Sequence, residues 1–271
     1  MLTVVQLRLD RLELLLARGL PQAALDSLDK GAGGDSLWAT SLKGRALFDL
    51  RRYADAQAVF EAALELSPED ADIKVWLEAS KMIATKGDPR RKADETLDSL
   101  GRKAKNKAPR FLHGTALLAT GKKRIARDKL EQSVEDISTE YPNPLAYRSY
   151  LVLAALDVAD GNVDAAREKL TMALEQNPGY LPVRDLMGQL LAETQPEDAL
   201  DHLADVIDAG VASANADAAF AIAVIKTGNG KPMAVEAVRR AKERGASTDW
   251  MQRAIAAVDP ALFEELGVPA P

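Results

Sequence analysis

The feature that most constrains this 271-residue chain is a short pattern of small and large apolar residues that recurs along it. In residues 44–68 and again in residues 161–178, an alanine is followed four residues later by a large apolar residue, then by Ala-Leu, and then by proline. Weaker copies keep the alanine and the apolar residue. The alanine positions are Ala24, Ala56, Ala93, Ala126, Ala166, Ala199 and Ala234, at spacings of 32, 37, 33, 40, 33 and 35 residues. Self-similarity at a nearly fixed period of this length indicates a repeat architecture.

Each repeat contains two amphipathic stretches of about three to four helical turns, separated by glycine or proline. The small alanine lets a neighbouring helix approach closely, and the larger residue one turn later fills the groove beside it. One helical hairpin cannot bury its apolar face alone, so the repeats must stack on one another. Only 5% of the residues are aromatic, while alanine and leucine, which favour helices, are abundant. The sequence therefore predicts an all-α fold.

The pattern resembles the tetratricopeptide repeat. The residues that carry the resemblance are Gly44, Leu47, Tyr53, Ala56, Phe60, Ala63, Leu64 and Pro68. Gly114 and Gly188 occupy the position of Gly44 in two other repeats, whereas Ala154 occupies it in a third. The resemblance implies a right-handed superhelical solenoid of about seven antiparallel helix hairpins, forming a single domain over residues 1–271.

Within that domain, residues 1–36 are expected to form an atypical N-terminal hairpin and residues 37–210 the best-matching repeats. Residues 211–271 are expected to form a degenerate repeat followed by capping helices, because the end of a solenoid needs a solvent-facing side. The 40-residue spacing contains an inserted loop, residues 138–144. Such an insertion either tolerates a difference in length or carries binding contacts.

Enzymatic motifs are missing from the sequence. There is no cysteine, which excludes disulfides, thiolate catalysis and Cys-ligated zinc. There is no HExxH, Gly-x-Ser-x-Gly or phosphate-binding GKS/GKT motif either. His113 and His202 lie in different repeats, and we interpret His113 as a core or groove residue. We therefore expect a protein that is not an enzyme and that binds no cofactor or metal.

Charge is distributed unevenly along the chain. The net charge is -6, yet residues 86–129 hold 14 Lys or Arg against 5 Asp or Glu. A solvated surface cluster is the simplest interpretation, and an electrostatic site for an acidic protein, nucleic acid or an anionic membrane surface is the alternative. Because Phe111 is the only aromatic residue available for base stacking there, nucleic acid is the less favoured partner. The basic residues between positions 102 and 127 are Arg102, Lys103, Lys105, Lys107, Arg110, Lys122, Lys123, Arg124 and Arg127.

The family resemblance also implies that the first helix of each hairpin lines a groove in which a peptide docks. Ser41 and Arg45 occupy the places where the family's clamp for chaperone C-termini needs lysine and asparagine, so we do not expect that clamp. Trp38 is either a binding contact or a seal against the preceding hairpin. The predicted groove residues are Trp38, Ser41, Arg45, Phe48, Phe111, Arg148, Arg184 and Gln189.

These observations favour a non-catalytic scaffold or adaptor that binds a peptide or protein, acidic or not, in the groove, within a larger bacterial multiprotein assembly. One alternative is binding of nucleic acid or an anionic surface through residues 102–127, and another is a repeat module cut from a larger enzyme. Charges at Arg8, Asp10, Arg11 and Glu13 interrupt the apolar N-terminus, so we expect no signal peptide. No stretch is apolar enough to predict a transmembrane segment. We expect a cytoplasmic protein, or a periplasmic one if a leader has been removed.

Overall fold

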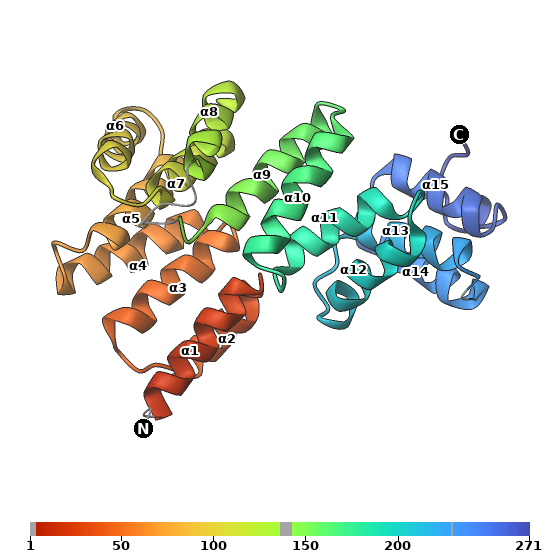
Figure 1. Ribbon diagram of the computed structural model, residues 1–271. Coiled ribbons are helices and arrows are strands. Elements are labelled where there is room, and N and C mark those ends of the chain that lie inside the picture. The colour runs from red at the N-terminus through yellow and green to blue at the C-terminus, as the bar shows by residue number, and fades with distance from the viewer. Residues whose placement is uncertain (1–3, 136–142, 229) are drawn as a thin grey trace. The chain divides into compact units, whose positions relative to one another are not determined.

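The computed structural model describes residues 4–135, 143–228 and 230–271, and these residues form sixteen helices and no strand (Figure 1). The predicted all-α class is therefore confirmed. The first eight helices are α1 (Val4–Ala17), α2 (Pro21–Asp29), α3 (Leu37–Asp49), α4 (Tyr53–Leu66), α5 (Ala71–Ala84), α6 (Asp88–Lys103), α7 (Ala108–Ala119) and α8 (Lys123–Val134). The others are α9 (Ala146–Ala159), α10 (Val163–Gln176), α11 (Leu181–Leu191), α12 (Pro196–Asp208), α13 (Ala214–Lys226), α14 (Lys231–Glu243), α15 (Thr248–Val258) and α16 (Leu262–Glu265).

The described residues divide into two compact units. Unit 1 comprises residues 1–156 together with residues 175–179, and unit 2 comprises residues 157–174 and 180–271. The division falls inside α9, so α1–α8 belong to unit 1 and α11–α16 to unit 2. The single domain predicted over residues 1–271, with its three parts, stays a prediction, and each unit is considered by itself.

Unit 1 is built by stacking of helical hairpins. Each helix from α1 to α8 packs on the next one in the chain. In addition, α1 packs on α3, α3 on α5 and α5 on α7. The first helix of each hairpin thus contacts the first helix of the next, which is the arrangement that lets repeats share one continuous core.

The seven repeated alanines all lie in the second helices, α2, α4, α6, α8, α10, α12 and α14. Each is 0% or 1% exposed, and in six of these helices the alanine is the fourth residue. Within each unit, the first-helix glycines face the large residue of the second helix. A Cβ added to Gly44 would lie 2.5 Å from Phe60 Cε1, and one added to Gly114 would lie 2.8 Å from Leu130 Cγ. These close approaches explain why the motif needs a residue without a side chain.

The turns inside most of the hairpins contain a left-handed residue, which glycine supplies at no steric cost. Gly121, between α7 and α8, has φ +86°. The turn between α3 and α4 has no glycine, and Arg51 takes φ +61° there instead. Among the described residues, Arg51 is the only non-glycine residue with positive φ, so this turn is the locally strained one.

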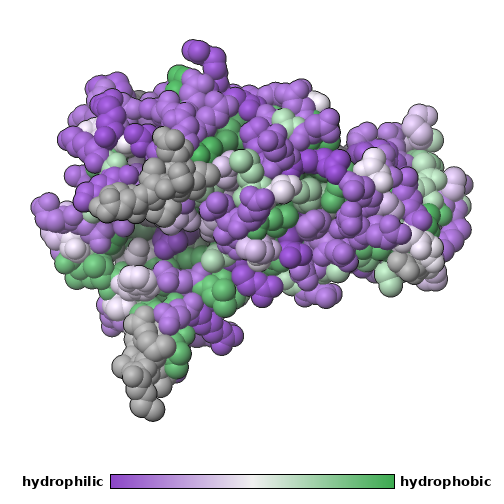
Figure 2. Space-filling model, viewed as in Figure 1, coloured by the Kyte–Doolittle hydropathy of each residue, from purple (hydrophilic) through white to green (hydrophobic). Residues whose placement is uncertain are grey.

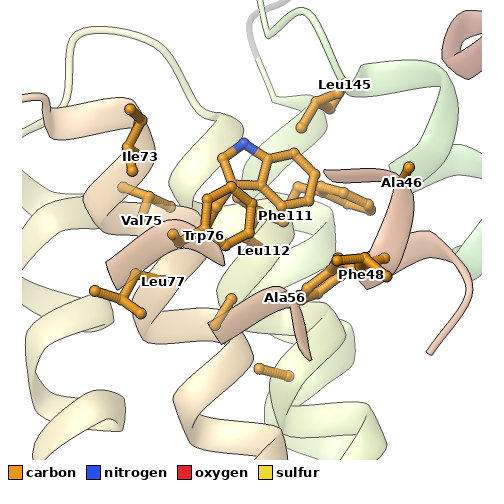
Figure 3. Packing of buried hydrophobic residues seen from close by; sticks show 14 of the residues in the cluster. Ala46, Phe48, Ala56, Ile73, Val75, Trp76, Leu77, Phe111, Leu112 and Leu145 are labelled. Carbon is orange, nitrogen blue, oxygen red and sulfur yellow. The ribbon is translucent and has the colours of Figure 1, made fainter. Parts of the chain in front are cut away.

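The core of unit 1 is organised around Trp76 of α5. Figure 3 shows its ring among Phe48, Phe111 and Leu112. Phe48 meets the Trp76 ring edge-on with centroids 5.2 Å apart, and Phe60 stacks on it at 6.2 Å. Aromatic pairs at these distances add to the stability that apolar burial provides. Trp76 thereby joins α3, α4 and α5 into one packed layer.

Unit 2 ends in the helical pair that the sequence predicts after the last repeat. Ile255 and Val258 of α15 and Leu262 of α16 are at most 7% exposed, and Trp250 and Phe263 are partly buried against the same cluster. The predicted inserted loop, residues 138–144, lies outside the described residues except for Asn143 and Pro144. Asn143 is buried and donates a hydrogen bond to the carbonyl oxygen of Ser133, at 2.8 Å.

Candidate functional site: a cavity on the first helices of unit 1

The first helices of unit 1 enclose a cavity of about 540 Å³. This volume is within the usual range of ligand pockets, roughly 300–1,000 Å³. The wall comes from the C-terminal part of α1, the N-terminal part of α3, the start of α5, and the residues at the beginning of α7 and α9. The residues that line it include Glu13, Trp38, Ser41, Arg45, Asp70, Asp72, Trp76, Asn106, Tyr147 and Arg148.

Three of the predicted groove residues reach this cavity from one helix. Trp38, Ser41 and Arg45 are separated by three and four residues on α3, a spacing that places side chains on one face. Trp38 is 51% exposed, so it does not seal the junction with the preceding hairpin as a buried residue would. Large exposed aromatic residues at the edge of a pocket are typical of binding contacts.

Two arginines line the cavity wall and influence each other, but only one of them has an ion-pair partner among the described residues. Arg148 of α9 forms an ion pair with Asp49 at the end of α3, and both side chains are largely buried. Arg45 forms no ion pair with any residue that the structure describes, and its Nε is buried without a hydrogen-bond partner. Its guanidinium lies over the Trp76 ring, 5.6 Å from the centroid, which gives a cation–π contact.

Burial lowers the pKa of Arg45 below its ordinary value, and the neighbouring Arg148 lowers it further. The carboxylates of Asp49 and Glu13 act in the opposite direction without reversing the shift. The direction of this pKa shift means that the surroundings disfavour the charged guanidinium. Arginine nevertheless stays protonated in proteins, so Arg45 brings to the cavity a positive charge that has no ion pair with a residue that the structure describes.

The other predicted groove residues are placed differently. Phe48 and Phe111 are 5% and 4% exposed and belong to the core, where Arg148 covers the Phe111 ring. Arg184 and Gln189 lie in unit 2, and both interact within that unit. Arg184 pairs with Asp205, at 2.8 Å, and Gln189 donates hydrogen bonds to Asp185 and Ser213.

Sequence reasoning missed several residues of the cavity, of which Trp76, Tyr147 and Asn106 are the most prominent. Trp76 lies in one of the repeats whose first helix has no glycine at the position of Gly44. The sequence pattern therefore does not define the register of α5. Burial raises the pKa of Tyr147, which keeps its hydroxyl protonated and able to donate a hydrogen bond. The sequence signal that could have indicated Tyr147 was its neighbour Arg148, which was predicted to line the groove.

The basic residues between positions 102 and 127 separate into two groups in the structure. Those up to Arg110 surround the junction of α6 and α7, and those from Lys122 onward lie at the start of α8, at the other end of α7. A twelve-residue helix is about 18 Å long. Carboxylates interleave with both groups, since Asp98 pairs with Arg102 and Asp94 pairs with Lys122. The nine residues therefore do not form one continuous surface.

His113 is buried between these two groups, on α7. It contacts Asp94 Oδ1 through Nε2 at 2.6 Å, and Lys122 Nζ contacts the other oxygen of Asp94 at 2.7 Å. Burial lowers the pKa of His113 despite the hydrogen bond from its ring to Asp94. Burial would raise the pKa of Asp94, but hydrogen bonds from Lys122 and His113 outweigh this and lower it. His113 is thus a neutral hydrogen-bond donor at neutral pH. No group of His, Asp and Glu in the described part of the chain could hold a metal ion.

We expect the stability of the fold to decrease as pH falls from about 7.5 to about 5, because unfolding returns the histidines to a pKa of about 6.5. A folded-state pKa below that value means that the unfolded chain binds more protons in this range, which favours unfolding. The depressed pKa of Asp94 acts only below about pH 4, a separate range. Replacing His113 by Gln should flatten the slope of unfolding free energy against pH, measured by urea titration.

The matched control is His202→Gln, since burial also lowers the pKa of His202. Each single variant is expected to remove part of the slope of unfolding free energy against pH, and the double variant is expected to remove nearly all of it. A His113→Gln variant with the slope of the parent protein would contradict the placement of His113 as a buried neutral side chain.

Comparison with known proteins agrees with the helical-repeat fold. The tetratricopeptide-repeat family model matches residues 41–77 and 111–180, and curated protein sequences give no match. The structure of PilF from Pseudomonas aeruginosa is 18% identical with a TM-score of 0.59, over 81% of this chain and 96% of PilF. A chain of the APC/C Cut9–Hcn1 hetero-tetramer is 14% identical with a TM-score of 0.57, over 90% of this chain and 48% of its own.

The human IFIT1 dimer with PPP-AAAA is 16% identical with a TM-score of 0.52, over 94% of this chain and 63% of IFIT1. The chain thus spans about half of the Cut9–Hcn1 chain and nearly all of PilF. Identities this low show the fold alone. Since the family match covers repeats whose glycines and alanines make the close helix contacts seen in the structure, we conclude that residues 41–77 and 111–180 are tetratricopeptide repeats.

Proposed function

We propose that this protein is a non-catalytic interaction scaffold that binds a segment of a partner protein in the cavity of unit 1. Tetratricopeptide repeats generally serve protein interaction rather than catalysis. The observation that carries the proposal is the convergence of Trp38, Ser41, Arg45 and Arg148 on one cavity. These are residue types that bind protein segments through aromatic contact, hydrogen bonds and charge.

The chemistry of the cavity wall supports binding rather than proton transfer. The cavity presents guanidinium, indole, hydroxyl and amide groups, from Arg45, Trp38, Ser41, Tyr147 and Asn106, beside the carboxylates of Glu13, Asp70 and Asp72. The Asp70 carboxylate is already engaged as the N-cap of α5. His113, whose pKa is lowered and which hydrogen-bonds to Asp94, does not line this cavity. The wall is therefore suited to hold a guest without transforming it.

Membership of a larger assembly is part of the same proposal. The chain has two compact units, each with its own hydrophobic core. Figure 2 shows a surface that is mainly polar on the face in view, and no helix of the described residues is both long and apolar enough to cross a bilayer. A chain with two cores can hold one partner in unit 1 and present unit 2 to another.

Filling the cavity should abolish partner binding. In the Ser41→Trp variant, an indole would occupy the space beside Trp38 and Arg45. Peptides selected from a random display library on the full chain should lose at least about tenfold in affinity for this variant. The matched control is Ala58→Trp, which puts the same side chain on the exposed face of α4. Equal loss in both variants, or no selected peptide sensitive to Ser41→Trp, would overturn the proposal.

A further inference from the structure

Two arginines line the cavity of unit 1, and only Arg148 has an ion-pair partner among the described residues. Arg45 and Arg148 lie close enough for each to influence the other, and Asp49 pairs with Arg148. Arg45 itself lines the cavity with a buried, unpartnered Nε. A buried charge without a partner is costly to the fold. Such a group is therefore a strong attachment point for an incoming carboxylate.

The guanidinium of Arg45 is also held in place before any ligand arrives. The Trp76 ring lies beneath it at 5.6 Å, and Trp76 is fixed by edge-on contact with Phe48 and by stacking with Phe60. A planar guanidinium offers parallel N–H donors that match the two oxygens of a carboxylate. Because the donor is already oriented, binding a carboxylate would require little reorganisation.

The wall of the cavity also contains carboxylates, which carry the opposite charge. Asp70 is engaged as the N-cap of α5, where its side chain accepts a hydrogen bond from Ile73 N at 2.9 Å. Glu13 of α1 and the exposed Asp72 of α5 also line the cavity, and neither forms an ion pair with a residue that the structure describes. Carboxylates in the wall repel a run of acidic residues and attract a basic one. The charge pattern therefore favours one acidic group set among neutral or basic neighbours.

We propose that the cavity binds a partner segment in which a single Asp or Glu is flanked by neutral or basic residues. The carboxylate of that residue pairs with Arg45. This inference rests on the proposed function. The exposed Trp38 ring would cover an apolar or basic neighbour of that acidic residue, since both pack favourably on an indole face. The recognised feature is thus an isolated side-chain carboxylate within the segment, and not a polyacidic tract.

A random peptide library displayed with its C-termini joined to the carrier tests this inference on the full chain. Wild-type protein should enrich peptides that share one Asp or Glu between neutral or basic residues. Arg45→Met should lose this motif, because it keeps much of the side-chain length and removes the charge. Arg124→Met makes the same chemical change on the exposed surface of α8 and should enrich the wild-type motif.

Synthetic peptides with amidated C-termini then measure the effect. Affinity for Arg45→Met should fall at least about tenfold, and replacing the peptide's acidic residue by its amide should cause a similar loss on wild type. Arg45→Lys, which keeps the charge without the planar fork, should retain part of the affinity. Circular dichroism melting checks that each variant is folded, and Arg45→Met should melt no lower than wild type because it removes a buried unpaired charge.

Two results would overturn the inference. One is an enriched motif without an acidic residue, or with a run of them, and the other is the same acidic motif enriched by Arg45→Met. If the selected peptides lack an acidic residue but still lose affinity for the Ser41→Trp variant, the proposed function stands and this inference fails. If no peptide depends on the cavity, both fail.

Discussion

Replacing Gly44 by alanine should destabilise unit 1 by about 1–3 kcal/mol, as overpacking of a tight core does. The new Cβ would lie 2.5 and 2.6 Å from two atoms of the Phe60 ring. Phe60 is fully buried and stacks on Trp76, so its ring has no space into which it can move. Alanine favours a helix over glycine by about 0.5–1 kcal/mol, which offsets only part of this cost. Urea unfolding gives the free energy, and hydrogen exchange by mass spectrometry assigns the change to α3 and α4.

Gly101→Ala is the matched control for this substitution. Gly101 also lies within a helix, α6, but a Cβ there would meet only Arg110 Cγ, at an ordinary contact distance of 3.6 Å. Here the helix preference of alanine acts alone and should stabilise the protein by about 0.5–1 kcal/mol. Substitutions of identical chemistry are thus expected to have opposite signs. The same sign at both positions would contradict the close approach of α3 and α4.

Asp217→Asn should destabilise unit 2 by about 1–3 kcal/mol, the usual cost of removing a charged hydrogen-bond partner. The Asp217 carboxylate on α13 is 0% exposed and accepts hydrogen bonds from Arg240 Nε at 3.1 Å and Arg244 Nη1 at 3.0 Å. Asparagine would turn an N–H donor or a weaker acceptor toward two guanidiniums. The arginine side chains are 30% and 42% exposed and can regain water, so the cost stays below that of a fully buried pair.

The control for this charge removal is Asp249→Asn on α15. The Asp249 side chain is 75% exposed and pairs with Arg253 one turn away, at 2.8 Å. An exposed pair of this kind contributes about 0–1 kcal/mol. Hydrogen exchange should show increased opening of α13 and α14 in Asp217→Asn and little change in Asp249→Asn. Equal small effects would show that Asp217 does not link α13 to α14.

Much of the fold could be predicted from the sequence because close helix packing requires small residues at fixed positions. Gly44 and Ala56 mark the two sides of one helix contact, and Phe60 fills the space between them. Such a requirement is local, so it leaves a periodic signal. The hairpin of α5 and α6 gave a weaker signal, since Ser80, fully buried and hydrogen-bonded to the Trp76 carbonyl oxygen at 2.8 Å, replaces the glycine.

The candidate site was less predictable because it depends on distances between repeats. Helix spacing alone places Trp38, Ser41 and Arg45 on one face of α3. It does not reveal that Arg148, 99 residues beyond Asp49, takes the carboxylate that would otherwise be available to Arg45. Nor does it separate Phe48, which points into the core, from Arg45 three residues earlier. The basic residues between positions 102 and 127 lie at opposite ends of α7, since the sequence has no Lys or Arg between Arg110 and Lys122.

The most direct test of the central claim is a double-mutant cycle between Arg45 and the acidic residue of a library-selected peptide, measured by isothermal titration calorimetry. Wild type and Arg45→Met are each titrated with the peptide and with its amide counterpart. If the carboxylate pairs with Arg45, the two changes should be strongly non-additive, with a coupling free energy of at least about 1.5 kcal/mol, as for close charge pairs at interfaces. Additive changes, with coupling near zero, would contradict a cavity built around an unpaired Arg45.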